Sequence, residues 1–250
     1  MQEIVGLLEE QQQELESLVS GLDDDGWSQP SACVGWDISD VLLHLAQTNE
    51  MATASTRGDF DVVLGRLLEG APPAANVDDG AEVMVQNERG RSGAEVHERY
   101  QRSCVDLRDG LLSCDPSARV TWVAGQLAAR TLATTRLAET WIHTTDVAEG
   151  LGVDVAPTDR LEQVARLAWR TLPYAFQRAG LEPPGPVAFR LTAPSGALWR
   201  FGAEDAPTII TGSGHDLCRV AGQRADAADT DLRGEGPDAA EVLRLVRTFA

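Results

Sequence analysis

One predicted helix, residues 131–152 (TLATTRLAETWIHTTDVAEGLG), constrains the fold of this chain more than any other segment. Its apolar residues recur at helical spacing, Thr131 or Thr134 can cap its start, and glycines mark its end. Residues four apart share one face of an α-helix, so Glu139 and His143 point the same way. The segment predicts an amphipathic helix that carries a carboxylate beside an imidazole. Such pairs are common on solvated helix faces, and a metal site would need a third ligand from elsewhere.

Further segments of the N-terminal part have the apolar periodicity of helices. They are residues 2–21, residues 34–55 with Asp37 or Ser39 as the cap, residues 60–68, and residues 81–113 with possible breaks at Gly90 and Gly93. Residues 115–130 are expected to form a linker, and no strand is expected before residue 152. Long helices with polar outer faces favour a four-helix bundle, in which inward side chains of facing helices build sites.

The pattern changes after residue 152. A helix over 159–178 is followed by strand-like runs at 187–193, 197–202 and 208–211, and then by helices at 214–223 and 237–249. The first two runs alternate and are joined by a Pro-Ser-Gly turn, which predicts a hairpin. We therefore predict an α+β protein with two domains: a helical bundle over residues 1–155 and a small α+β domain over residues 156–250.

Charge limits the partners of this chain. It has 39 acidic and 21 basic residues and a net charge of -18, which repels nucleic acids and anionic membrane surfaces. Every basic residue is arginine, which excludes Schiff-base chemistry on lysine. We see no apolar run long enough to span a bilayer and no secretory signal, so the expected location is the cytoplasm. Both a monomer and a homodimer are compatible with the sequence.

The cysteines are scattered and have no paired spacing. We expect them to be free and mostly buried thiols, and a catalytic cysteine is not favoured. They are Cys33, Cys104, Cys114 and Cys218.

The histidines differ in their surroundings. His97 lies among charged residues and is expected at the surface, whereas His215 suits a polar position at a helix start. His44 and His143 each lie near the apolar side of a helix, and a buried histidine needs partners for both ring nitrogens. Two interpretations stay open: His44, Glu139 and His143 form a hydrogen-bonded cluster that fixes the bundle, or they form a metal site with open coordination positions.

Two motifs resemble a known family. GWDISDVLLHL, which ends just after His44, and LAETWIHTTDVAEGLG are similar to the actinobacterial maleylpyruvate isomerase family, the mycothiol-dependent branch of the DinB-like metal-binding bundles. The similarity covers nearly the whole chain. The tracts PTDRLEQVARLAWRTLPYAF and GEGPDAAEVLRL resemble an actinobacterial subgroup described only as metal-binding, and the second domain resembles sterol-carrier-like folds.

The resemblance implies a divalent metal, usually zinc, held by His44, Glu139 and His143 in a cleft between the bundle and the α+β domain. It also implies an arginine of the second domain that faces the metal, for which Arg224 is the best match and Arg219 the second choice. Asp146, one turn after His143, is either a hydrogen-bond partner of that histidine or an exposed helix residue.

One position departs from the common HGxD pattern of the family. This chain has threonine in place of the glycine, in the order His143-Thr144-Thr145-Asp146. We expect the threonine to narrow or polarise the cleft and to affect the choice of substrate rather than the metal.

Three functions follow as hypotheses. The first is an isomerase or S-transferase that uses a metal-bound low-molecular-weight thiol such as mycothiol on a small, carboxylated electrophile. In it, Arg224 holds the substrate carboxylate or stabilises a developing enolate. The second is a metal-dependent hydrolase, lyase or cyclase that uses no thiol. The third is a non-catalytic, metal-stabilised binding module. A non-haem iron oxygenase shares the ligand set, but the resemblance argues against it.

Overall fold

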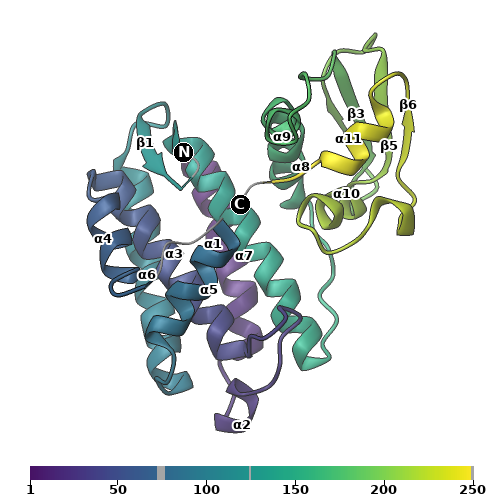
Figure 1. The fold of residues 1–250 in the computed structure, drawn as a ribbon. Coiled ribbons are helices and arrows are strands. Elements are labelled where there is room, and N and C mark those ends of the chain that lie inside the picture. Colours follow the sequence, from purple (N-terminus) through teal and green to yellow (C-terminus); the bar gives the residue numbers. More distant parts are fainter. Residues whose placement is uncertain (72–76, 124, 249–250) are drawn as a thin grey trace. The chain divides into compact units, whose positions relative to one another are not determined.

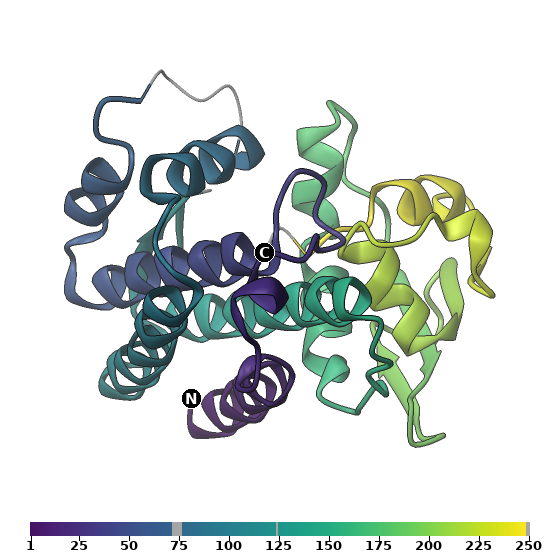
Figure 2. The same cartoon turned by 90° about the horizontal axis from the view of Figure 1, so that it is seen from below.

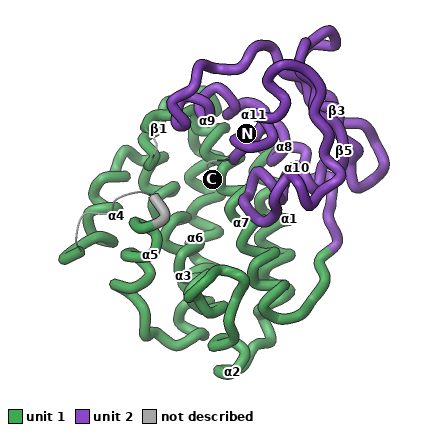
Figure 3. Tube along the Cα trace, turned by 45° about the vertical axis from the view of Figure 1, so that its right-hand side comes forward, with its two compact units in different colours: residues 1–155 green, residues 156–250 purple. Residues whose placement is uncertain are grey.

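The computed structural model describes residues 1–71, 77–123 and 125–248. The chain divides into two compact units, unit 1 (Met1–Val155) and unit 2 (Ala156–Ala250) (Figure 3). Unit 1 is helical apart from one short hairpin, and unit 2 combines a small sheet with helices (Figure 1). The predicted α+β class, with the helical part first, is confirmed. Among the described residues, no helix is both long and apolar enough to cross a membrane.

Unit 1 is built around four long helices that pack against one another. Its helices are α1 (Gln2–Val19), α2 (Asp24–Trp27), α3 (Ile38–Arg57), α4 (Phe60–Leu67), α5 (Val77–Glu88), α6 (Gly93–Ser113) and α7 (Ala129–Leu151). The long helices α1, α3, α6 and α7 form the bundle, and α3 and α7 lie side by side within it (Figure 2). This pairing matters because the candidate site residues come from these two helices.

Local sequence fixes where the bundle helices begin. Asp37 starts α3 with a capping box in which its side chain accepts the Asp40 N–H at 2.8 Å and the Asp40 side chain accepts the Asp37 N–H. Ser92 and Glu95 form the same arrangement at α6. The predicted helix over 81–113 is therefore two helices, because α5 ends at Glu88 and Ser92 caps the start of α6.

Helix α7 differs from the amphipathic helix predicted for residues 131–152. Most of its side chains are buried, because α1, α3 and α6 surround it. It also begins earlier, at Ala129, and neither Thr131 nor Thr134 caps it. The N–H groups of Ala129 and Arg130 instead donate to the carbonyls of Ala118 and Pro116 at 2.9 and 3.0 Å.

The stretch expected to be a linker contains a hairpin. Strands β1 (Arg119–Trp122) and β2 (Gly125–Ala128) pair antiparallel, so the prediction that no strand precedes residue 152 was wrong. Val120 and Trp122 are buried on one face, but an alternation of only four residues is too short to recognise in a sequence. Strand β2 ends at Ala128, and α7 begins at the next residue, Ala129.

Unit 2 contains a four-stranded sheet with the order β4-β3-β5-β6. Its elements are α8 (Leu161–Arg170), α9 (Leu172–Arg178), β3 (Val187–Thr192), β4 (Leu198–Phe201), β5 (Thr208–Ser213), α10 (Gly214–Ala221), a 3-10 turn (Ala227–Asp229), β6 (Arg233–Glu235) and α11 (Ala239–Leu245). The predicted β3–β4 hairpin is confirmed, whereas β5 runs parallel to β3 and antiparallel to β6. The sequence did not reveal β6, whose three residues are all exposed.

One predicted helix of unit 2 is interrupted. Residues 159–178 form α8 and α9 with a break at Thr171, because Pro173 has no N–H to continue the hydrogen bonds of α8. The Thr171 hydroxyl oxygen lies 3.0 Å from the Leu167 carbonyl and 2.7 Å from the Arg247 carbonyl, which is the shorter of the two contacts. The break thus anchors the C-terminal segment within unit 2.

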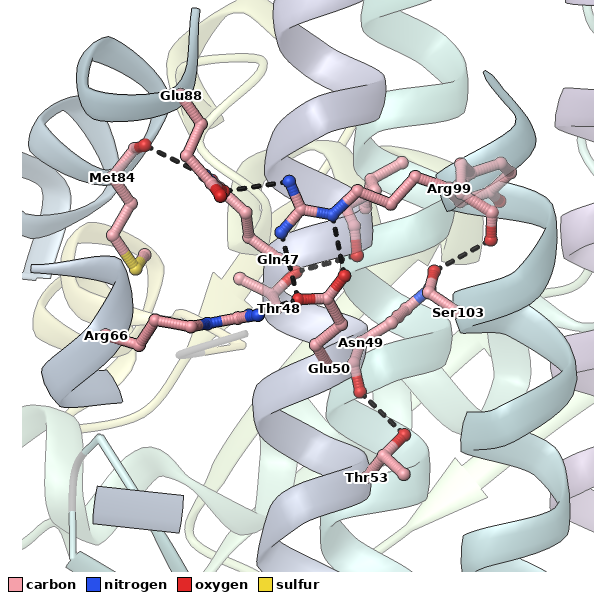
Figure 4. A network of polar contacts seen from close by, with 12 residues as sticks. Gln47, Thr48, Asn49, Glu50, Thr53, Arg66, Met84, Glu88, Arg99 and Ser103 are labelled. Carbon is pink, nitrogen blue, oxygen red and sulfur yellow. Dashed lines mark hydrogen bonds and ion pairs between the residues drawn. The ribbon is translucent and has the colours of Figure 1, made fainter. Parts of the chain in front are cut away.

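A polar network joins the helices on one side of the bundle (Figure 4). Arg99 of α6 donates to Glu50 of α3 through two nitrogens, at 2.6 and 2.9 Å, and to Glu88 of α5 at 2.8 Å. Gln47 donates to Glu88 at 2.8 Å, and Arg66 of α4 donates to Glu50 at 2.7 Å. Because Arg99 is largely buried and fully engaged, this network ties four helices together rather than presenting a free binding group.

Candidate metal centre

Three side chains from α3 and α7 meet inside the bundle. His44 Nε2 lies 3.3 Å from Glu139 Oε2, and the ring centroids of His44 and His143 are 5.0 Å apart. One ligand atom from each of the three lies within 4.8 Å of the others. Both histidines are only 7% exposed. The structure therefore brings together the three residues that the sequence suggested.

Charges around Glu139 keep its carboxylate ionised. Burial by itself would raise the pKa of Glu139, but His44, His143 and Arg136 together hold that pKa well below its usual range. Arg136 Nη1 lies 3.5 Å from Glu139 Oε2, and its Nη2 donates to the Thr48 hydroxyl at 2.8 Å. A buried guanidinium thus lies beside a buried, ionised carboxylate.

Asp146 sets the protonation of His143. Asp146 Oδ2 lies 2.9 Å from His143 Nδ1, and Asp146 is only 1% exposed, so it is not a surface residue of the helix. Burial opposes the charged form of His143, but the contacts with Asp146, Cys33 and Glu139 raise its pKa to about 10. Nδ1 is thereby held as a donor to the carboxylate. A cation bound at the other nitrogen would replace a proton there.

The donor set suits a divalent metal. Two imidazoles and one carboxylate are typical ligands of zinc and of other first-row divalent ions with open coordination positions. His44 Nδ1 is buried, and no described residue offers it a hydrogen bond, so the hydrogen bonds of the described residues leave one ring nitrogen of the cluster unsatisfied. Burial also lowers the pKa of His44, which keeps the imidazole neutral, as a metal ligand must be.

Trp36 forms an aromatic wall of this centre. Its ring centroid lies 5.1 Å from that of His44 and 6.5 Å from that of His143. Its indole N–H donates to Glu82 of α5. Arg89 donates hydrogen bonds to the Gly35 carbonyl and to the Asp40 side chain. The segment before α3 is therefore fixed over the two histidines.

The structure adds two residues that the sequence analysis did not select. Cys33 Sγ lies 3.0 Å from Asp146 Oδ2 and 3.6 Å from His143 Nδ1. No local signal could reveal this contact, because 113 residues separate Cys33 from Asp146. Arg136 was detectable, since it lies three residues before Glu139 on one helix face.

Thr144 bonds to its own helix and to α1. Its hydroxyl donates to the Thr140 carbonyl at 2.6 Å and accepts a hydrogen bond from Gln11 of α1 at 3.2 Å. The side chain therefore faces α1 rather than His44 and Glu139, and an effect of Thr144 on the choice of substrate stays a prediction. A residue next to His143 in a helix is rotated by about 100° from it, which explains the difference in direction.

The remaining candidates come from other elements of the chain. Arg224 follows α10 in unit 2, where its Nη1 donates to the Gly222 carbonyl at 3.0 Å, and Arg219 lies 3.6 Å from Asp216 within α10. A role of either arginine at the metal stays a prediction. His97 is half-buried rather than at the surface, because it bonds Glu16 at 2.9 Å and links α6 to α1.

This combination defines a class: a helical bundle with a two-histidine, one-carboxylate centre, followed in the chain by a small α+β unit. The chain belongs to the mycothiol maleylpyruvate isomerase N-terminal domain family, whose model matches residues 8–148. The resemblance found in the two motifs is thereby confirmed.

Curated relatives and solved structures also match this chain. Uncharacterized proteins from two strains of Mycobacterium tuberculosis are 33% identical over 238 residues, which is 95% of this chain and 91% of theirs. A crystal structure of the mycothiol-dependent maleylpyruvate isomerase matches with a TM-score of 0.62 at 17% identity and covers 95% of both chains. A histidine-to-alanine mutant of that isomerase matches with a TM-score of 0.61. At this identity, the structural match shows a shared fold.

Proposed function

We propose that this protein is a divalent-metal-dependent enzyme in which His44, Glu139 and His143 hold the metal, most simply zinc. The observation that carries the proposal is the burial of these three donors within 4.8 Å of one another in a member of this family. Its cosubstrate is a low-molecular-weight thiol such as mycothiol. Its substrate is a small, carboxylated electrophile, which it isomerises or joins to the thiol.

The chain's own residues prepare the centre for this chemistry. Asp146 holds the proton on His143 Nδ1 and thereby aims the other ring nitrogen at the metal position. Arg136 helps to keep Glu139 ionised, and the Trp36 ring packs against the His44 ring. A divalent metal bound there supplies Lewis acidity that lowers the pKa of a thiol.

Isomerisation by a thiol needs no other reactant. The thiolate adds to an activated double bond, the resulting single bond rotates, and elimination releases the same thiol with the double bond in its new geometry. If the proton lost by the thiol is instead added to the carbanion formed by the addition, the carbon–sulfur bond is retained and the product is the thiol adduct. Arg224 remains our candidate for binding the substrate carboxylate.

Metal content of the purified protein tests the first part of the proposal. We expect one equivalent of zinc or another divalent metal per chain by elemental analysis, and its loss in His44→Ala with the fold retained by circular dichroism. His97→Ala is the matched control, because His97 lies in unit 1 and bonds Glu16 instead. A folded protein that binds no metal after reconstitution would leave the three residues as a structural polar cluster.

Thiol use is tested separately with the cobalt-substituted protein. Direct thiolate binding should produce a charge-transfer band in the near ultraviolet when excess thiol is added. Absence of the band together with turnover in the absence of thiol would select a hydrolase, lyase or cyclase. Loss of folding in His143→Ala without any turnover by the wild type would select a metal-stabilised binding module.

A further inference from the structure

The segment from Pro30 to Trp36 packs closely on the last turns of α7. The Ala32 N–H donates to the Asp146 carbonyl at 3.1 Å. Gly150 permits the approach, because a Cβ there would lie 2.5 Å from the Pro30 carbonyl oxygen. Backbone contacts therefore fix this segment against the helix that carries Glu139 and His143.

Hydrogen bonds inside the segment fix its own shape. The Ser31 hydroxyl donates to the Trp36 carbonyl at 2.9 Å and accepts the Cys33 N–H at 3.1 Å. The Trp36 N–H donates to the Cys33 carbonyl at 3.0 Å. One rigid turn thus places Trp36 over the histidine rings and Cys33 against Asp146.

The Cys33 thiol meets the buried carboxylate at the oxygen that contacts His143. Asp146 Oδ2 lies 3.0 Å from Cys33 Sγ and 2.9 Å from His143 Nδ1. An S–H donor and an N–H donor therefore converge on one carboxylate oxygen. This arrangement fixes both the rotamer of Asp146 and the distance of its oxygen from the imidazole.

The cysteines outside this segment have other surroundings. Cys114 lies 3.7 Å from the Thr56 carbonyl, and Cys218 lies 3.5 Å from the Leu161 carbonyl. Cys104 is buried beside Asn49, at 3.7 Å from its side-chain nitrogen. Cys114 is half-buried like Cys33 but packs against the other core cluster of unit 1, so it provides a matched control.

We propose that Cys33 is a positioning residue for the metal ligand His143 and acts through Asp146. Its thiol holds the carboxylate in the position that keeps the imidazole correctly oriented toward Glu139 and His44. The inference rests on the proposed metal site. Partners beyond the direct ligands commonly change metal affinity by roughly ten- to a hundredfold when they are removed.

Cobalt binding by cysteine variants tests this role without any assay of activity. Cys33→Val retains the volume but removes the donor, and we expect cobalt affinity to fall by roughly tenfold with a shifted visible spectrum. Cys33→Ser retains a donor and should restore most of the affinity and the spectrum. Cys114→Ser should leave both unchanged. If valine prevents folding, Cys33→Ala gives the same comparison.

A double-mutant cycle with Asp146→Asn tests the route of the effect. If Cys33 acts through the carboxylate, Cys33→Val should have little further effect on cobalt affinity in the Asp146→Asn background. Equal losses in both backgrounds would overturn the proposal, as would an unchanged affinity in folded Cys33→Val or an equal loss in Cys33→Ser. A wild-type protein that binds no cobalt would overturn the proposed metal site itself.

Discussion

At the scale of single residues, the centre is a set of buried charges that stabilise one another. Arg136 is 1% exposed and faces Glu139, while His143 faces Asp146. Each of these charges would be costly in the protein interior without its partner. The arrangement places an ionised carboxylate beside two imidazoles, and a divalent cation that binds there would displace the proton from the second ring nitrogen of His143.

Replacement of Arg136 should show how much the buried charge of Glu139 depends on its partner. Arg136→Met leaves Glu139 without its nearby cation, and we expect the metal-free protein to lose about 3 kcal/mol of unfolding free energy. Zinc should reduce the loss, because the metal supplies positive charge next to Glu139. Urea denaturation with and without saturating zinc measures both values.

Arg102→Met is the control for this change. Arg102 pairs with Glu98 on the surface of α6, where both side chains are 67% exposed, so the effect should be close to zero. A loss in Arg136→Met that is equal with and without zinc would contradict the proposed electrostatic role.

At the scale of elements, close packing of the segment before α3 on α7 holds the centre together. Gly150 lies inside α7, where glycine is intrinsically unfavourable, yet a side chain there would meet the backbone of Pro30 and Ser31. At the end of the same helix, Gly152 adopts a φ of 66°, as predicted for a C-terminal glycine. The two glycines therefore have different tasks, one in packing and one in helix termination.

A pair of glycine substitutions separates packing from helix propensity. Gly150→Ala should destabilise the protein by about 1–3 kcal/mol, because the clash with the Pro30 carbonyl outweighs the better helix former. Gly6→Ala in α1 should stabilise it by about 0.5–1 kcal/mol, since its Cβ would meet nothing within 4 Å. Thermal and urea unfolding check both signs, and stabilisation by Gly150→Ala would show that the contact is loose.

The network around Arg99 gives a pH dependence. Burial raises the pKa of Glu88, but the hydrogen bond from Gln47 and the ion pair with Arg99 lower it by more than burial raises it. The net pKa therefore lies below its usual value. A carboxylate with a lowered folded-state pKa stabilises the fold above its unfolded pKa of about 4.3, and this contribution is lost as the pH falls through the folded value.

Glu88→Gln should therefore cost about 1 kcal/mol near neutral pH, and the difference from wild type should shrink as the pH falls below roughly 4. Urea unfolding between neutral and acidic pH measures it. Glu98→Gln, on the exposed surface of α6, should show almost no difference at any pH. A cost in Glu88→Gln that does not vary with pH would indicate lost packing rather than lost charge.

At the scale of the whole molecule, the candidate metal ligands and the candidate substrate-binding arginine belong to different units. The three candidate ligands, Asp146 and Cys33 all lie in unit 1, whereas Arg224 lies in unit 2. Each unit has its own buried residues, as expected of parts that fold around separate cores.

Metal binding should therefore reside in unit 1 alone. We expect a fragment of residues 1–155 to fold and to bind cobalt within about threefold of the affinity of the full chain. Circular dichroism and cobalt titration test this, with the His44→Ala fragment as the control. A folded fragment without metal affinity would show that unit 2 contributes to the centre.

The sequence determined the features that depend on short-range order. Helical periodicity placed the long helices, the Asp37 cap fixed the start of α3, and the spacing of four residues put Glu139 and His143 on one face of α7. These features follow from backbone geometry within a few residues, so they are readable without a tertiary structure. The position of His44 near the apolar side of its own helix made it the third candidate ligand, and the two family motifs supported that choice.

Only the tertiary structure decided which faces are buried and which distant residues meet. It surrounds α7 on most sides, brings Cys33 to Asp146 across 113 positions, and turns Thr144 toward α1. It also forms the β1–β2 hairpin, whose four-residue strands are stabilised by packing rather than by a recognisable pattern. Such contacts depend on how helices pack, and side-chain packing is set by the complete fold rather than by local propensity.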